Sequence, residues 1–148
     1  MTALDCGLDT LLAAQPLGGM AALRSKSLAL TDLFIELVQQ RCAGHGLTLV
    51  TPREHALRGS QVCLSRQDPA RSSGDSGAYA IVRALIERGV IGDFRAGDGP
   101  RHPDILRFGF TPLYLGFADV WHAAEHLRQV LDTGEWHNPL FQQQQSVT

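Results

Sequence analysis

The sequence contains a single lysine, Lys26, and only three cysteines among its 148 residues. Lys26 is therefore the only side-chain amine that could hold a carbonyl cofactor covalently. Its place in a helical pattern, between two serines, favours an ordinary solvated side chain instead. The cysteines Cys6, Cys42 and Cys63 are odd in number, far apart and without metal-ligand spacing. They favour a reduced, cytoplasmic protein.

Long hydrophobic runs are also missing. No segment approaches the roughly 20 apolar residues that span a bilayer, and the first residues lack the basic and apolar regions of a secretory signal. The net charge of −2 gives no reason to expect nucleic acid or an acidic membrane as a partner. With 44% hydrophobic and 19% charged residues, the composition is that of a globular domain with a sizeable core.

The hydrophobic periodicity predicts an α+β fold. Leu30, Leu33, Phe34 and Leu37 repeat at helical spacing within a long N-terminal helix. The expected elements are helices over 20–42, 76–89 and 117–133, with strands over 47–51, 58–65, 90–95 and 105–110. The last helix should bury Phe117, Val120, Trp121, Ala124, Leu127 and Leu131, and residues 68–76 form a polar loop. This order indicates a small, mainly antiparallel sheet with helices packed on one face.

One strand carries an unexpected charge. Leu106, Phe108 and Phe110 alternate on one face, which leaves Arg107 on the other face beside Gly109. An arginine in this position either extends to solvent or meets a planar anion. The alternative for Arg107, as for Arg58, is a surface ion pair worth less than about 1 kcal/mol.

Other candidate sites are weak. No serine, cysteine or threonine lies in a nucleophile motif, and Cys63, inside a strand, fits a packing role better than a reactive one. His122 and His126 share a helix face, but they lack the H-E-x-x-H order and a third zinc ligand. The glycines of the loop 95–101 match no phosphate-binding motif. From the residues alone we therefore predict no catalytic, cofactor-binding or metal-binding residue.

Four blocks of sequence resemble the C-terminal segment of bacterial kynureninases. They are AALRSKSL with LTDLF (21–34), RGSQV (58–62), LIERGVIGDFR (85–95) and LRFGFTPLY with DVW (106–121). The resemblance covers about residues 18–136. It implies the small domain of a homodimeric pyridoxal-phosphate enzyme with the aspartate aminotransferase fold (fold type I). Such hydrolases convert kynurenine or 3-hydroxykynurenine to anthranilate or 3-hydroxyanthranilate plus alanine, in tryptophan catabolism.

The resemblance assigns one site residue. Arg107 matches the family arginine that grips the substrate α-carboxylate, whereas Arg58 and Ser60 match a block without a clear role. The family's cofactor lysine and phosphate-binding residues belong to a large domain that this sequence lacks, and Lys26 does not match that lysine. We therefore expect the chain to bind no pyridoxal phosphate and to be inactive alone.

The expected organisation is an extension over residues 1–17, the kynureninase-like domain with its linking helix over 18–136, and a disordered tail over 137–148. The expected partner is the missing large domain, with a kynurenine-type amino acid as substrate of the complete enzyme. The alternative is a stand-alone, non-catalytic module that binds a partner or self-associates.

Overall fold

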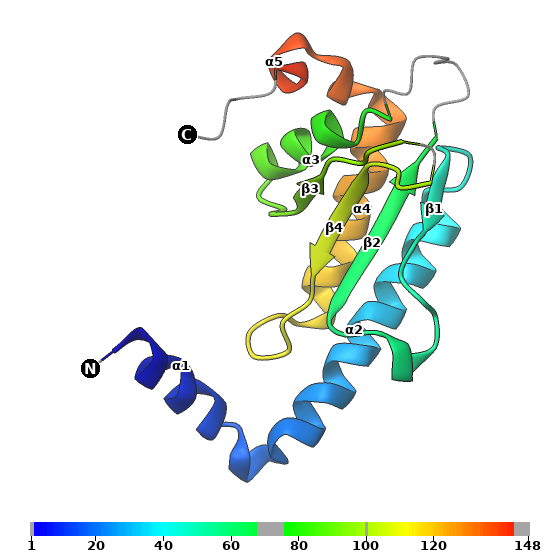
Figure 1. Cartoon of the computed structure of the whole chain (residues 1–148). Helices are drawn as coiled ribbons and strands as arrows, with labels where there is room; N and C mark the ends of the chain where they lie inside the picture. The colour runs from blue at the N-terminus through cyan, green and yellow to red at the C-terminus, as the bar shows by residue number, and fades with distance from the viewer. Residues whose placement is uncertain (1, 68–75, 100, 144–148) are drawn as a thin grey trace.

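A long helix and a four-stranded sheet organise the molecule (Figure 1). The computed structural model describes residues 2–67, 76–99 and 101–143. Helix α2 spans Gly19–Arg41, and the apolar side chains along one side of its second half are buried, among them Leu30, Phe34 and Val38. These positions recur every three or four residues, so they lie on one face. The long helix predicted over 20–42 is confirmed.

The sheet consists of β1 (Leu47–Leu49), β2 (Gln61–Arg66), β3 (Asp93–Arg95) and β4 (Ile105–Gly109). All pairs are antiparallel, in the order β1-β2-β4-β3. In the central pair, Val62 lies opposite Phe108 and Leu64 opposite Leu106. Because cross-strand partners point to the same side, these four buried residues form a single apolar face.

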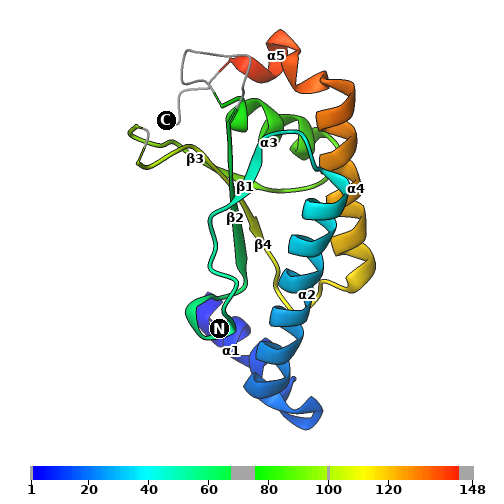
Figure 2. The same cartoon turned by 90° about the vertical axis from the view of Figure 1, so that its right-hand side faces the viewer.

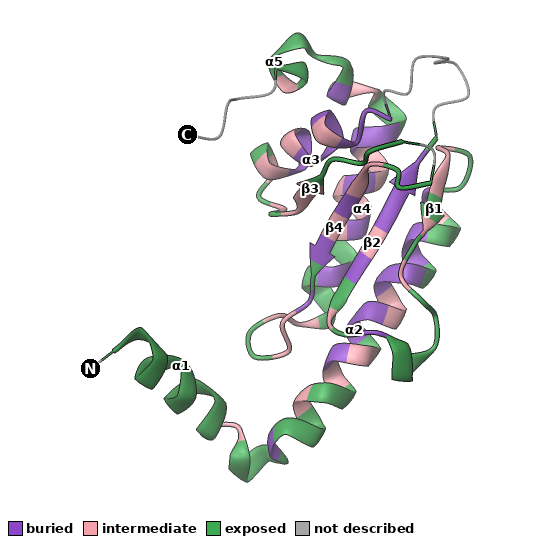
Figure 3. Cartoon of the chain, viewed as in Figure 1, coloured by how far each residue is buried: buried purple, intermediate pink, exposed green. Residues whose placement is uncertain are grey.

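Helices α2, α3 (Ala78–Glu87) and α4 (Phe117–Thr133) pack on this apolar face, and Figure 2 shows α2 and α4 along one side of the sheet. The rings of Phe34 and Phe108 lie 5.0 Å apart, and those of Phe34 and Phe110 lie 4.9 Å apart. Figure 3 shows the buried residues gathered where sheet and helices meet. The predicted α+β fold, with helices on one face of an antiparallel sheet, is confirmed.

Helix α1 (Ala3–Leu12) was not predicted. Thr2 and Asp5 form a capping box at its start, which satisfies backbone N–H groups that have no partner within the helix. The turn η1 (Gln15–Leu17) and Gly18 then join it to α2. Gly18 has φ of 104°, and a Cβ at this position would approach the Ala22 Cβ to 2.8 Å, so the elbow requires glycine. None of the residues of α1 is buried, and the helix stands away from the sheet (Figure 1).

The C-terminal tail, expected to be disordered from residue 137 onward, contains two short helical segments in the structure. The turn η3 (Glu135–His137) and helix α5 (Pro139–Gln142) follow α4. Trp136 is buried, and the Asn138 side chain accepts a hydrogen bond from Leu140 N–H. The expected disorder of the tail stays a prediction, and residues 144–148 lie outside the described part. The domain boundaries at residues 17 and 136 stay predictions.

Two predicted core positions on α4 are wrong. Phe117 is 53% and Trp121 44% exposed, because the buried face of α4 runs through Val120, Ala124 and Leu127 and these two rings lie at its margin. Instead, the Arg41 guanidinium lies 4.6 Å from the centre of the Trp121 ring. Val130 is buried further along the helix.

Smaller differences concern element ends. Strand β3 begins at Asp93 instead of residue 90, because Val90 N–H donates back to the Leu85 carbonyl and still belongs to the end of α3. Gly77 takes the N-cap position of α3, although the neighbouring Ser76 hydroxyl accepts from Ala78 N–H. A short turn, η2 (His55–Leu57), connects β1 to β2. The predicted loop over 68–76 lies, apart from its last residue, outside the described residues.

In the part of the chain that the structure describes, no helix has both the length and the apolar character needed to cross a membrane.

Candidate functional site

Arg107 lies in β4 on the side of the sheet that carries Cys63, Asp93 and Gly109, called here the open face. The register places Arg107 directly opposite Cys63 of β2 and also opposite Asp93 of β3. Cross-strand partners share a face, so both neighbours project to the same side as the guanidinium. The apolar partners Leu106 and Phe108 point the other way, into the core. The sheet therefore holds the arginine between a thiol and a carboxylate.

The guanidinium of Arg107 is paired but not enclosed. Its Nη2 donates to Oδ2 of Asp93, and the side chain remains 30% exposed. Asp93 Oδ2 also accepts from Nε of Arg95 at 2.9 Å. The two arginines and the one carboxylate give the group a formal charge of +1, which suits a single anion.

The space beside Arg107 along its own strand is open. Gly109 is exposed, and a Cβ built on it would meet no atom within 4 Å. Since residues two apart on a strand share a face, this open space lies on the side to which the guanidinium projects. The sequence left three possible partners for Arg107, namely solvent, a planar anion or a charged side chain in a surface ion pair, and the structure shows the ion pair. In the structure its partner is the carboxylate of Asp93, and part of the side chain stays open to a ligand.

Arg58 is not the surface ion pair that the sequence suggested. Its side chain is 1% exposed, and its Nη2 donates to Oδ1 of Asp32 in α2. His55 Nε2 lies 2.9 Å from the other carboxylate oxygen. Burial raises the pKa of Asp32, but the hydrogen bonds from Arg58 and His55 outweigh burial and hold that pKa below its ordinary value. This group ties η2 to the long helix, and it shares no residue with the group around Arg107 on the open face.

The other candidate residues, among them Lys26, His126 and Cys42, make contacts within the fold. Lys26 Nζ donates to the Pro112 carbonyl at 2.8 Å, which ties α2 to the turn after β4. His126 Nδ1 lies 3.4 Å from Nη1 of Arg88. Among the described residues, no three His, Cys, Asp or Glu side chains are grouped as metal ligands would be. Burial raises the pKa of the Cys42 thiol to about 11, so this thiol behaves as a small apolar side chain.

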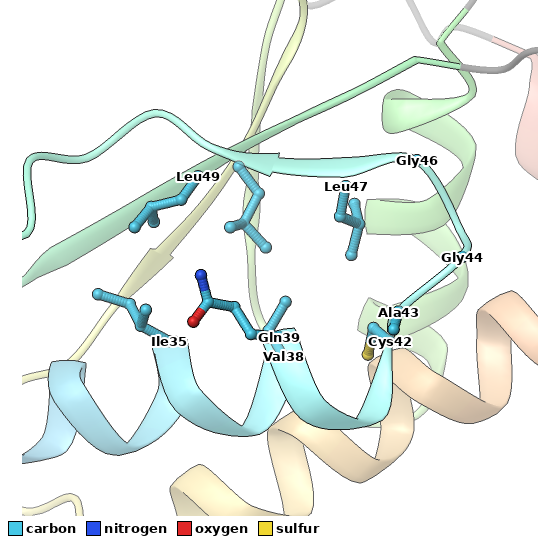
Figure 4. A pocket seen from close by; sticks show the side chains of 10 residues that line it. Ile35, Val38, Gln39, Cys42, Ala43, Gly44, Gly46, Leu47 and Leu49 are labelled. Atoms are coloured by element: carbon cyan, nitrogen blue, oxygen red, sulfur yellow. The ribbon is translucent and has the colours of Figure 1, made fainter.

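Two hollows border the core. One, of about 520 Å³, lies between α2 and the edge strand β1 (Figure 4). Ile35 and Val38 lie below Leu47 and Leu49 in it, and none of its lining residues belongs to β4. The other, of about 440 Å³, lies beside the end of β4, where Gly109 and Phe110 meet Tyr114 and His122. Only the second borders the strand that carries Arg107.

Comparison with known proteins decides the family. The kynureninase C-terminal domain matches residues 23–127. The chain belongs to this family. It is 52% identical to a kynureninase of Pseudomonas fluorescens over 145 residues, which is 98% of this chain and 30% of that protein. It is 48% identical to kynureninases of Burkholderia mallei strain SAVP1 and Burkholderia pseudomallei strain K96243 over 148 residues, which is all of this chain and 31% of each relative.

The resemblance seen in the sequence is therefore confirmed, and the chain spans about 30% of the length of the kynureninases it matches. Arg58 and Arg107 both lie within the matched family region. Asp93 and Arg95, which complete the charged group around Arg107, had no predicted role. A usable indication was present, because Asp93 and Arg95 alternate with Phe94 as Arg107 alternates with its apolar neighbours. The missing information was that β3 pairs with β4.

Proposed function

We propose that this chain supplies the substrate-carboxylate arginine, Arg107, to a kynureninase-type active site. A polypeptide equivalent to the remainder of the relatives completes that site. The substrate of the assembled enzyme is kynurenine or 3-hydroxykynurenine, and the products are the corresponding anthranilate and alanine. The observation that carries the proposal is the position of Arg107, a partly exposed guanidinium on the open face of a rigid sheet. The family membership supplies the reaction.

The chemistry of the arginine supports this role. A guanidinium presents parallel N–H donors that match a carboxylate, and a strand positions it more precisely than a loop does. Holding the α-carboxylate fixes the orientation of the amino acid relative to the reacting bond. Arg107 thus acts by binding and orienting the substrate, and we propose no proton transfer or covalent step for it.

The residues of this chain do not fit pyridoxal phosphate, the cofactor of the family, without a partner. Lys26, the only lysine in the sequence, is part-buried, and its amine donates to the Pro112 carbonyl. When bound in a complete enzyme, the cofactor serves as the electron sink for the substrate. We propose that its binding residues are supplied by the partner polypeptide and that this chain by itself is inactive.

The exposed surface of α1 supports the proposal that this chain binds a partner polypeptide. Leu4 is 71% exposed, and Leu8, Leu11 and Leu12 are exposed as well. Across the elbow, Leu17 and Met20 continue this apolar surface. Exposed apolar surface of this extent typically marks an interface. The relatives contain additional polypeptide about twice the length matched by this chain, since the match covers 30% of them, and we propose that the equivalent large domain covers α1.

Fragment complementation tests the proposal. The chain is mixed with pyridoxal phosphate and the polypeptide corresponding to the remainder of the Pseudomonas fluorescens kynureninase, and anthranilate release from kynurenine is followed by fluorescence. We expect no release from the chain alone and measurable release from the mixture. Arg107→Ala should lower kcat/KM of the mixture about a hundredfold, as expected when a bidentate charged contact is lost.

Arg53→Ala is the matched control. Arg53 forms an exposed ion pair with Glu36 at 3.4 Å, away from the open face, so this substitution should leave kcat/KM unchanged. Release of anthranilate by the chain alone would refute the proposal, as would an inactive mixture whose two polypeptides elute together.

The second candidate function is a non-catalytic module that self-associates. The exposed leucines of α1 favour it, because two copies could cover each other's apolar surface. Light scattering separates the alternatives. A concentration-dependent dimer that Leu4→Ser and Leu8→Ser together convert to a monomer supports self-association, whereas a strict monomer that binds the partner polypeptide supports the complementing domain.

A further inference from the structure

We propose that Asp93 positions Arg107 for carboxylate binding and that Arg95 offsets the negative charge of Asp93. This inference rests on the proposed function, because it assigns a role to the neighbours of the proposed carboxylate-binding arginine. Neither Asp93 nor Arg95 contacts the carboxylate in this arrangement. They act through Arg107, so they are positioning residues and not catalytic ones.

The sheet fixes the position of Asp93. Asp93 lies opposite Arg107, in a strand whose three residues are all paired with β4. An aspartate side chain is short, so its carboxylate cannot move far from a paired backbone. Arginine, in contrast, has a long and flexible side chain with considerable rotamer entropy. The contact with Asp93 therefore holds the Arg107 side chain near β3 before any ligand binds. The binding of a ligand then costs less side-chain entropy.

The contact leaves most of the guanidinium available. Arginine has five N–H donors, and within the described residues Asp93 engages one of them, on Nη2. Four therefore remain, enough for the two parallel bonds of a planar carboxylate. Asp93 uses a single oxygen, Oδ2, for both Arg107 and Arg95. It therefore restrains the arginine at one corner and does not occupy the position of a bidentate ligand.

Arg95 keeps the site attractive to an anion. Arg107 and Asp93 alone would form a neutral pair, and an incoming carboxylate would meet the repulsion of Asp93. With Arg95 bound to the same oxygen at 2.9 Å, the group of three has a net charge of +1. Arg95 is more exposed than Arg107. We propose that it acts through its positive charge, at the edge of the open face, and not by binding the ligand.

The opposite role, in which Asp93 fills the ligand position until a substrate displaces it, makes a different prediction. In that case, removing the negative charge would strengthen carboxylate binding. In the positioning role, removal of the charge frees Arg107 to rotate and weakens binding. Asp93→Asn separates the two roles because it keeps the size and the acceptor oxygen of the side chain but removes its charge.

The first experiment uses the chain alone. Modification of Arg107 by phenylglyoxal is followed by peptide mass spectrometry in the unchanged chain and in Asp93→Asn. We expect Arg107 to be modified about two to five times faster in Asp93→Asn, which corresponds to the loss of a partly exposed ion pair. Arg53 is the internal reference and should keep its rate. Glu36→Gln is the matched control and should accelerate Arg53 but not Arg107.

The second experiment uses the complemented mixture described above. Asp93→Asn should raise KM for kynurenine about tenfold and change kcat less than twofold, because Arg107 is still present but less well ordered. Arg95→Gln should raise KM less than Asp93→Asn does. Asp98→Asn, at an exposed residue paired with His102, is the control for the substitution itself and should have no effect.

The outcomes distinguish the two proposals. If Arg107→Ala leaves KM and kcat unchanged, the proposed function fails. If Arg107→Ala impairs the mixture but Asp93→Asn alters neither KM nor Arg107 modification, only the positioning role fails. An unchanged modification rate in the chain alone refutes the positioning role even when no active mixture forms. A lower KM for Asp93→Asn would assign Asp93 the displaced-ligand role instead.

Discussion

Phe34 in α2 lies against both Phe108 and Phe110, with ring centres 5.0 and 4.9 Å apart. The three aromatic residues connect the long helix to the strand that carries Arg107. Phe34 has no exposed surface. The position of the guanidinium on the open face thus depends on packing on the opposite side of the same strand.

Phe34→Ala should be among the most damaging single substitutions in this chain. It removes a fully buried ring and leaves a cavity beneath β4, at a cost of about 3–5 kcal/mol of unfolding free energy. That is a large share of the 5–15 kcal/mol typical of a folded domain. Urea denaturation followed by circular dichroism measures the loss. Leu8→Ala, on the exposed α1, is the control and should change stability by about 0.5 kcal/mol or less; equal effects of the two substitutions would contradict this prediction.

Stability should fall in acid partly because of Glu125. Hydrogen bonds from Arg128, Arg41 and Gln129 hold the pKa of Glu125 well below its ordinary value of 4.5. The unfolded chain therefore takes up a proton on this residue before the folded chain does. The stabilisation is fully present above about pH 4.5 and is lost progressively as the pH falls further.

Urea midpoints measured between pH 3 and pH 7 test this effect. Glu125→Gln should flatten the acid side of the stability curve, although Asp32 and Glu135, whose pKa values are also lowered, keep part of the slope. Glu87→Gln, at an exposed residue at the end of α3, is the control. An unchanged slope in Glu125→Gln would show that the ion pairs of this residue do not contribute.

The cysteines should react in an order set by burial. The pKa of Cys42 is raised from 9.0 to about 11, so its thiolate fraction at pH 8 is about a hundredfold lower than that of an ordinary thiol. Cys6 is exposed on α1. Brief alkylation with iodoacetamide, read by mass spectrometry, should label Cys6 first and Cys42 only after addition of urea. Labelling of both at similar rates in the folded chain would contradict the structure.

Asp32→Asn should destabilise the chain more than the removal of a charge from an exposed ion pair does. It leaves the buried guanidinium of Arg58 without its carboxylate, and such an unpaired buried charge is costly. Because the Asp32 side chain is 46% exposed, water reaches the pair, and we expect a loss of about 1–3 kcal/mol instead of the full buried-pair value.

A double-mutant cycle with Arg58→Met checks this interpretation. The double variant Asp32→Asn with Arg58→Met should lose less stability than the sum of the single variants, because no unpaired charge remains. Glu36→Gln, which breaks an exposed pair, should cost under about 0.5 kcal/mol. Additive effects of Asp32→Asn and Arg58→Met would mean that the two residues act independently.

Local sequence patterns predicted the elements that carry a regular stripe of apolar residues. Helix α2 and strand β4 carry clear apolar stripes, and both were placed within a few residues. Helix α1 was missed because its residues read as mixed in polarity, although Leu4, Leu8 and Leu11 repeat at helical spacing. These leucines are exposed in the structure. Trp121 and Phe117 fit the stripe of α4, but periodicity defines a face only approximately and does not show which positions at its margin the core covers.

The sequence by itself determined the family, the α+β class and the presence of an arginine on the polar side of an otherwise apolar strand. These follow from short-range periodicity and from blocks of residues that are close in the chain. Only the tertiary structure decided that β3 lies beside β4, that Asp93 therefore meets Arg107, and that Arg58 is buried against α2. The physical reason is that cross-strand and strand-helix partners are chosen by the packing of the whole core, which no local pattern encodes.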